Sequence, residues 1–281
     1  MAKKPLFNKV VIVGAGLIGG SIGLAVKKRK LAKFVAGVVR RRETAIRVIE
    51  KKAVDMATLD LAEGVQGADL VILCAPVSTI IRQIPLIKPY LKKNAIVIDV
   101  GSSKRRIESA ARKHLKRNTF VGCHPMAGSA CLGVEHADAE LFDGAQCFIT
   151  RSNHRVHRLW KAMGAHPILL DAKLHDAWVA RASCLPHLLA FSLFQKESFG
   201  RFSLTRLKAL NPSIKELARL AHSDAALWSD IFMSNPDTIK ALYAFEKSLG
   251  RLKKILHSKK SGELENYIRV SNRMAAAVSA Q

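Results

Sequence analysis

The sequence predicts an α/β protein with a doubly wound parallel sheet, followed by an all-helical region. The 281-residue chain is 49% hydrophobic, which is enough for a sizeable core. Its first half alternates short apolar runs with helical patterns, whereas helical patterns dominate after residue 152. Strands that are apolar throughout are typical of parallel sheets covered by helices on both faces. We therefore expect a domain boundary near Ser152, which gives domains 1–151 and 152–281.

The elements of the first domain follow from its apolar runs. We expect a first strand at 10–13 and a helix at 17–30, because apolar residues there recur at helical spacing. A second strand at 34–39 precedes a helix at 43–52, and a third strand at 70–74 is ended by Pro76. The remaining strands are expected at 95–100, 119–122, 148–150 and 166–170, and the remaining helices at 80–87, 105–115 and 156–163.

The second domain has long amphipathic patterns and few strand signals. The predicted helices are 173–199, which contains Pro186, and then 215–232, 236–258 and 262–280. The pairs Asn235-Pro236 and Ser261-Gly262 mark breaks or first turns between them.

Charge and cysteine content restrict the class of protein. The chain has 46 Lys and Arg against 22 Asp and Glu, a net charge of +24. Nucleic-acid binding is nevertheless disfavoured, because the 6% aromatic residues are not interleaved with the basic runs. No apolar run approaches a membrane span. The 5 cysteines are odd in number and lack C-x-x-C spacing, so we expect no disulfide framework, no metal site and a cytoplasmic location.

A glycine-rich turn follows the first expected strand. Gly14, Gly16 and Gly19 form the pattern G-x-G-x-x-G, with Leu17 and Ile18 between the last two glycines. In a strand–turn–helix context the first glycine permits the tight turn, the second lets the backbone approach a pyrophosphate, and the third lets helix and strand pack closely. The unpaired N–H groups of the helix N-terminus favour phosphates. The first domain is therefore predicted to be a Rossmann-type dinucleotide-binding domain.

The end of the second strand distinguishes between two dinucleotides. An acidic residue there would accept hydrogen bonds from the adenosine ribose and favour NAD. This chain has Arg40 and Arg41 instead, and guanidinium groups can pair with a 2′-phosphate. We therefore predict NADP rather than NAD as the cofactor. We also expect Ala75 and Pro76, which follow the third strand, to contact it.

Three further segments carry polar residues at predicted strand ends or on the long helix. The motifs Asp-Val-Gly-Ser, His-Pro-Met-Ala-Gly and Leu-Pro-His begin at Asp99, His124 and Leu185. Taken in this order with the glycine turn, they resemble the prephenate/arogenate dehydrogenase family of tyrosine biosynthesis. Smaller matches begin at Leu141, Leu174, Arg219 and Trp228, so the resemblance spans nearly the whole chain.

The resemblance implies a reaction and the residues that perform it. Members of this family oxidise the ring hydroxyl of prephenate or arogenate and release CO2, so that the ring becomes aromatic. His124 matches the histidine that hydrogen-bonds this hydroxyl, and Ser102 matches the serine that orients the histidine. Arg219 and His187 match residues that contact the substrate, and Ser183 is a weaker candidate of the same group. The family also implies a homodimer formed through the helical domain.

The chain departs from the family pattern near the expected substrate. Cys184 replaces a histidine, residues 211–216 replace a Gly-Phe-Arg-Asp stretch, and Ala130 replaces a glutamate. Two other functions therefore stay open: another NADP-dependent hydroxyacid or imine dehydrogenase, and a catalytically silent dinucleotide-binding protein. Lys104 could contact phosphate or substrate, or be an ordinary solvated lysine. We expect no added regulatory module, so feedback by tyrosine would act at the active site.

Overall fold

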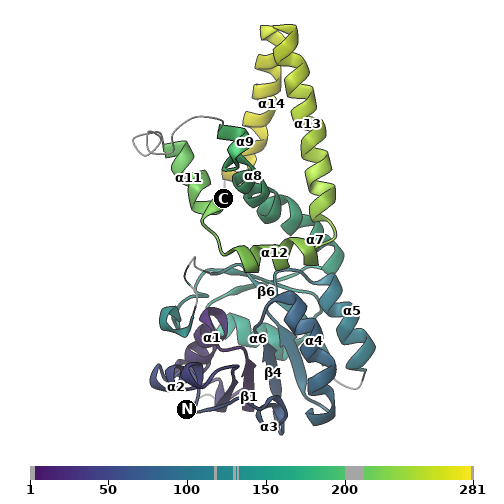
Figure 1. The fold of residues 1–281 in the computed structure, drawn as a ribbon. Helices are drawn as coiled ribbons and strands as arrows, with labels where there is room; N and C mark the ends of the chain where they lie inside the picture. Colours follow the sequence, from purple (N-terminus) through teal and green to yellow (C-terminus); the bar gives the residue numbers. More distant parts are fainter. Residues whose placement is uncertain (1–3, 117–118, 129–130, 132, 200–211, 280–281) are drawn as a thin grey trace. The chain divides into compact units, whose positions relative to one another are not determined.

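An eight-stranded sheet forms the centre of the first part of the protein (Figure 1). The computed structural model describes residues 4–116, 119–128, 131, 133–199 and 212–279. They belong to two compact units, Met1–Pro236 and Asp237–Gln281. The strand order is β3-β2-β1-β4-β5-β6-β7-β8. The strands are β1 (Phe7–Val13), β2 (Ala32–Val38), β3 (Met56–Thr58), β4 (Leu70–Leu73), β5 (Ile96–Asp99), β6 (Thr119–Pro125), β7 (Gln146–Ile149) and β8 (His166–Leu169).

Both faces of the sheet are buried, as the uninterrupted apolar runs predict. Val10 and Ile12 of β1 pack into one core cluster, and the alternate residues Val11 and Val13 pack into the other. The first cluster includes residues from α1 (Leu17–Lys28), α2 (Arg42–Glu50) and α6 (His154–Ala162). The second includes residues from α3 (Leu61–Val65), α4 (Val77–Ile87) and α5 (Arg105–His114). This arrangement confirms the predicted doubly wound fold.

Two strands differ from the prediction. β3 pairs with β2 at the edge of the sheet, although its three residues are too short to stand out as a strand in the sequence. β7 runs antiparallel to β6, whereas a uniformly parallel sheet was expected. β8 then pairs in parallel with β7, so the sheet continues beyond Ser152, where we expected the domain boundary. That boundary stays a prediction.

The predicted helix 173–199 is divided into shorter pieces. α7 (Ala172–Val179) passes into a π-helical turn at Ala180–Cys184, then α8 (Leu185–Leu193) and a short α9 (Lys196–Phe199). Pro186 has no N–H and its ring would clash with the carbonyl four residues earlier in a regular helix. A π turn at this point changes the hydrogen-bond register, which lets the chain continue in the same direction.

The predicted helix 215–232 is also interrupted. The structure has α11 (Pro212–Ala221) and α12 (Ala225–Ser234), and Asp224 caps α12 by accepting a 2.7 Å hydrogen bond from Leu227 N. α12 contacts the sheet domain, because the Asp230 carboxylate accepts from Ser78 N at the start of α4.

Helix α6 begins with a side-chain cap, because Asn153 accepts hydrogen bonds from Arg155 N and Val156 N.

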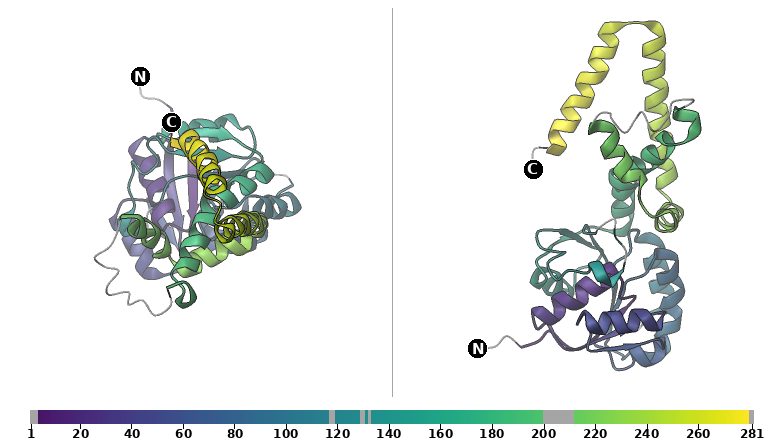
Figure 2. Two further views of the ribbon diagram at one scale, coloured as in Figure 1. Left: turned by 90° about the horizontal axis from the view of Figure 1, so that it is seen from above. Right: turned by 60° about the vertical axis from the view of Figure 1, so that its left-hand side comes forward.

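The second compact unit is a pair of long helices, α13 (Thr238–Ser258) and α14 (Ser261–Ser279), seen clearly in Figure 2. Lys259 between them has a left-handed backbone, with φ 55°. The Ser248 hydroxyl lies 2.7 Å from the Tyr267 hydroxyl, which joins the two helices. In the described part of the chain, no helix has the length and apolar character needed to cross a membrane.

Candidate active site

The glycine turn lies where the strand order reverses, between β1 and β4. Gly14 has a φ of 97°, and a Cβ there would lie 2.3 Å from Cys74 O at the end of β4. A Cβ on Gly19 would lie 2.3 Å from Gly14 O, so the start of α1 packs directly on the turn. A Cβ on Gly16 would meet no protein atom within 4 Å. This approachable backbone, with no acidic residue in the first turn of α1, fits a pyrophosphate.

The other residues of the predicted cofactor site surround this turn. Leu17 is buried and Ile18 packs against the core, so both can offer a ligand backbone N–H groups only. Cys74 N donates a 2.7 Å hydrogen bond to Val13 O, which brings the following residues Ala75 and Pro76 beside the turn. Parallel sheets bind ligands at such a reversal point.

The two arginines predicted to select NADP follow β2. Arg40 and Arg41 are exposed, and Arg41 occupies the position immediately before α2. Val39 N donates to Thr58 O in the neighbouring β3 segment, which holds the backbone just before them. No acidic side chain stands between Val38 and Arg42, where the ribose-binding acid of an NAD site would lie.

His124 stands near the carboxyl end of β6 and is hydrogen-bonded to a second histidine. Its Nδ1 lies 2.9 Å from Nε2 of His175, which is fully buried in α7. The Nδ1 of His175 lies 2.9 Å from Oδ1 of Asp176. Burial, followed by the neighbouring His175 and Lys104, holds the pKa of His124 well below 6.5. His124 is therefore neutral at physiological pH and can accept a proton.

Asp176 also closes the N-terminus of α5. Its two carboxylate oxygens accept from Lys104 N at 2.7 Å and Arg105 N at 3.0 Å. α5 starts at Arg105, and the Asp176 side chain therefore takes the role of its cap. Ser102 is half-buried in the loop between β5 and α5.

Lys104 is part of a buried ion pair below His124. Its side chain is 0% exposed, and its Nζ donates to the Asp99 carboxylate and, at 2.7 Å, to Cys123 O. Asp99 also accepts from Gly101 N and Cys123 N. Burial raises the pKa of Asp99 and the Lys104 ammonium opposes that rise. Neither role considered for Lys104, a ligand contact or a solvated surface charge, fits this position, because the network anchors the residue preceding His124.

The remaining predicted residues form a second group on the helices. His187 donates from Nδ1 to Ser183 O at 2.9 Å, across the π turn. Its ring stacks on Trp228 of α12, with the ring centroids 3.5 Å apart. Burial, followed by the Arg219 charge, lowers the pKa of His187. Arg219 itself is 67% exposed on α11 and lies 3.6 Å from Glu216.

Three further residues of these groups, His175, Asp176 and Trp228, were not predicted as site residues. They lie in the smaller family matches that begin at Leu174 and Trp228, and an isolated Leu-His-Asp or Trp-Ser-Asp in a helix carries no chemical signal. Cys184 is buried and packs with Val179 and Ile231, whereas Ala130 and Asn211 lie outside the described residues. Among the residues that the structure describes, no cluster of His, Cys, Asp and Glu could hold a metal ion.

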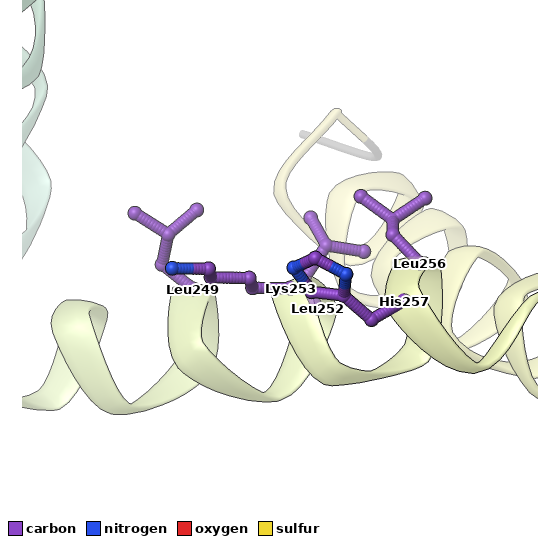
Figure 3. A pocket seen from close by; sticks show the side chains of 5 residues that line it. All are labelled: Leu249, Leu252, Lys253, Leu256 and His257. Carbon is purple, nitrogen blue, oxygen red and sulfur yellow. The ribbon is translucent and has the colours of Figure 1, made fainter.

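A shallow hollow elsewhere, on α13, has a different character. Figure 3 shows its lining: Leu249, Leu252, Lys253, Leu256 and His257. These residues recur at helical spacing on one side of α13, and Leu249 and Leu256 are more than half exposed. The lining is mostly apolar, so this surface is better suited to contact with another protein surface than to catalysis.

The sheet, the glycine turn and the neutral histidine are the features of a dinucleotide-dependent dehydrogenase. The chain matches the family model "Prephenate dehydrogenase, nucleotide-binding domain" over residues 22–169 and "Prephenate dehydrogenase, dimerization domain" over residues 171–270. The chain therefore belongs to the prephenate dehydrogenase family.

Individual relatives agree with this assignment. A prephenate dehydrogenase of Lactococcus lactis is 30% identical, over 96% of this chain and 77% of the relative. Among solved structures, prephenate dehydrogenase from A. aeolicus in complex with hydroxyphenyl propionate and NAD+ has a TM-score of 0.87 at 27% identity, covering 96% of this chain and 98% of the other. Synechocystis arogenate dehydrogenase has a TM-score of 0.81 at 26% identity, covering 96% and 99%.

Proposed function

We propose that this protein oxidatively decarboxylates prephenate or arogenate, giving 4-hydroxyphenylpyruvate or tyrosine, with NADP as the hydride acceptor. The observation that carries the proposal is the hydrogen-bonded His124, a neutral histidine at the carboxyl end of a strand in a dinucleotide-binding sheet. Membership of the prephenate dehydrogenase family supports it. So does the A. aeolicus relative, whose complex contains a phenolic carboxylic acid and a nicotinamide cofactor.

His124 is the proposed catalytic base. A neutral imidazole hydrogen-bonded to the ring hydroxyl can take its proton as the carbon–hydrogen bond breaks. Bound NADP would accept the hydride from that carbon. The carbon–carbon bond to the ring carboxylate then breaks and CO2 leaves. The electron pair of the broken bond enters the ring, which becomes aromatic, and negative charge develops on the oxygen of the former hydroxyl. This oxygen then takes the proton back from His124.

The other residues are proposed to hold the substrate for this step. Ser102 orients His124 and the ring hydroxyl. Arg219 is proposed to bind a substrate carboxylate, because a guanidinium fork suits this group. His187 already donates its Nδ1–H to Ser183 O, so it is proposed to contact the substrate through Nε2 as an acceptor. Ser183 is kept as a weaker contact. Holding the substrate in place lowers the barrier by orientation rather than by new chemistry.

NADP is proposed over NAD because of Arg40 and Arg41. Both are exposed beside the predicted adenosine site, and no carboxylate there would repel a 2′-phosphate. Gly14, Gly16, Gly19 and the backbone of Leu17 and Ile18 are proposed to bind the pyrophosphate, with Ala75 and Pro76 beside the nicotinamide half.

The roles of the two domains, the oligomeric state and the cellular location are part of the same proposal. We propose that the sheet domain binds the cofactor and that the helical part completes the substrate site and forms a homodimer. The family model for residues 171–270 is named as a dimerization domain, and α13 exposes an apolar face. The odd number of cysteines, 5, and the lack of C-x-x-C spacing support a cytoplasmic location, since disulfide frameworks are typical of oxidising compartments.

The test is a steady-state assay of purified protein in all four pairings of prephenate or arogenate with NADP or NAD. Reduction is followed at 340 nm, and the aromatic product is identified by chromatography. We expect reduction with NADP, and loss of it in His124→Asn. His157→Gln, at an exposed position on α6, is the matched control and should keep full activity.

Each other outcome changes the proposal in a defined way. Activity with only one substrate identifies it, because prephenate and arogenate differ in a keto or amino group. Equal activity with NAD would overturn the cofactor part alone. Bound NADP without turnover in any pairing would overturn the reaction, and leave a different substrate or a silent dinucleotide-binding protein.

A further inference from the structure

The proposed base, His124, is one end of a row of three buried or partly buried side chains. Asp176 Oδ1 lies 2.9 Å from His175 Nδ1, and His175 Nε2 lies 2.9 Å from His124 Nδ1. The two outer members come from β6 and α7, and the row runs from a carboxylate to the edge of the candidate active site. Nothing in the proposed reaction requires His175 or Asp176 to touch the substrate.

The chemistry of Asp176 determines the direction of these hydrogen bonds. Its carboxylate receives Lys104 N at 2.7 Å and Arg105 N at 3.0 Å, besides His175. Backbone N–H groups can only donate, so this carboxyl group serves as an acceptor on both oxygens. His175 must then carry its proton on Nδ1, and neutral His175 has a bare Nε2.

The protonation of His175 also determines which nitrogen of the His124 ring carries the proton. Because Nε2 of His175 can only accept, Nδ1 of His124 must be the donor. In a neutral imidazole the other nitrogen, Nε2, is then the bare one. His175 cannot turn away from this arrangement easily, since it is 0% exposed and its ring packs edge-on against Phe148 at 5.6 Å.

We infer that His175 and Asp176 are positioning residues that hold His124 as its Nδ1–H tautomer, so that Nε2 is the atom that takes the substrate proton. This inference rests on the proposed function for its catalytic consequence only. When His124 becomes cationic, its Nδ1–H still donates to His175. The Asp176 carboxylate lies at the far end of the row, where it accepts from His175 Nδ1.

The test replaces the middle residue in two ways. His175→Phe keeps a ring but removes the acceptor for His124. His175→Gln restores an amide oxygen that can reach the position of Nε2. Asp171→Asn is the matched control, because the Asp171 side chain caps the same α7 helix through Lys173 N and Leu174 N, and the change leaves its backbone bond to His175 N in place.

The first readout is ¹⁵N NMR of the histidine rings, which reports which ring nitrogen is protonated. The His124 signals are identified as those that disappear in the His124→Asn variant. We expect wild-type His124 to be protonated on Nδ1 and bare on Nε2. In His175→Phe the proton should move to Nε2, and in His175→Gln and Asp171→Asn it should stay on Nδ1. Asp176→Asn should shift the His175 Nδ1 proton upfield, because that proton loses a charged acceptor.

The second readout is the kinetics of the same variants. His175→Phe should lower kcat by about 10²- to 10⁴-fold, the usual contribution of a general base, with KM changed only a few-fold. His175→Gln should recover at least a tenth of the wild-type kcat. Dinucleotide binding should be unchanged throughout, which shows that the variants are folded.

The outcomes separate this inference from the proposed function. A wild-type His124 protonated on Nε2, or a His175→Phe variant with wild-type kcat, overturns the inference while the reaction stands. If the wild-type protein oxidises neither substrate, the proposed reaction fails, and the NMR measurement still decides whether His175 and Asp176 set the tautomer.

Discussion

At the scale of single residues, the candidate active site buries polar side chains in hydrogen-bonded groups. His124, His175 and Asp176 form one group of three, and Lys104 forms a buried ion pair with Asp99 next to them. The hydrogen bonds in each group satisfy polar atoms that would be costly to bury alone. Substitutions here should therefore separate effects on stability from effects on chemistry.

Lys104 should matter for stability more than its place in a basic run indicates. Lys104→Met would leave the Asp99 carboxylate buried without its charged partner, and breaking such a pair typically costs about 3–5 kcal/mol. Urea unfolding measures the loss. The double variant Lys104→Met/Asp99→Asn should recover part of it, since no uncompensated charge remains. A single variant as stable as wild type would contradict this account.

The two buried histidines should make stability depend on pH. Burial lowers the pKa of both His124 and His175 in the folded state, whereas unfolded histidine titrates near 6.5. The unfolded chain therefore binds more protons just below that pH, so their contribution is complete above about pH 6.5 and is lost as the pH falls.

Urea unfolding at several pH values below and above 6.5 tests this dependence. His124→Gln should show a smaller loss of stability on acidification than wild type. His157→Gln, at an exposed site, should follow wild type. Parallel curves for wild type and His124→Gln would exclude His124 as a source of the dependence.

The arginines after β2 should act on one dinucleotide only. Charge-assisted hydrogen bonds contribute about 1.5–3 kcal/mol, so the double variant Arg40→Ala/Arg41→Ala should weaken NADP binding by roughly 10- to 100-fold. NAD binding should be unchanged, because NAD lacks the 2′-phosphate. Fluorescence titration of both dinucleotides measures this, with Arg42→Ala as the control. Equal weakening of both would point to a general charge effect.

At the scale of elements, two glycines of the glycine turn should affect stability and dinucleotide binding to different degrees. A Cβ at Gly16 meets no protein atom within 4 Å, but its backbone angles, φ −81° and ψ −147°, lie outside the regions that alanine prefers, so Gly16→Ala should lower the Tm modestly and by less than Gly19→Ala. It should still weaken NADP binding by about tenfold or more, or ~1.4 kcal/mol, because the pyrophosphate loses its close approach.

Gly19→Ala is the contrasting variant. Its Cβ would lie 2.3 Å from Gly14 O, so α1 must move away from the turn and both Tm and binding should fall. Thermal unfolding and dinucleotide titration of the two variants side by side make the comparison. A Gly16→Ala protein that binds NADP like wild type would argue against a pyrophosphate at this turn.

Elements that are determined by a local sequence pattern, such as an apolar run or a glycine spacing, could be predicted from the sequence. The turn at Gly14 and the strands β1, β4 and β5 are of this kind, since apolar runs and glycine spacing express them directly. The break at His222–Asp224 was missed, because only a capping Asp224 marks it and no proline or glycine does. Pro186 indicated a disturbance in its helix, but the π turn that absorbs it depends on the surrounding packing.

The candidate site was predictable only in part, for a related reason. His124 stood out because it follows a strand, at the edge where ligands bind. His175 is 51 residues away, and its role depends on one contact that the sequence pattern does not express. Lys104 resembled its neighbours Arg105 and Arg106, and only the buried Asp99 and Cys123 carbonyl distinguish it from them.

At the scale of the whole molecule, the apolar face of α13 should form the subunit contact. Leu249 and Leu256 lie seven residues apart on one face and are 51% and 56% exposed. Leu249→Glu/Leu256→Glu should convert the proposed dimer into monomers, because unpaired charges would be buried at the contact.

Light scattering after size exclusion measures the mass of each form. Leu86→Glu is the control, since Leu86 is 58% exposed on α4, in the first compact unit. It should keep the wild-type mass. A wild-type protein that is monomeric at all concentrations would rule out the dimer itself.

The row from Asp176 to His124 has a consequence for how the protein can be divided. His124 lies in the part matched by the nucleotide-binding model, whereas His175 and Asp176 lie in the part matched by the dimerization model. The proposed base and the groups proposed to orient it are therefore encoded in different modules. A chimera that joins this sheet domain to the helical half of a relative should therefore keep its activity only if the relative has a histidine and an aspartate at the positions of His175 and Asp176. With a relative that lacks them, both modules would have to be exchanged together.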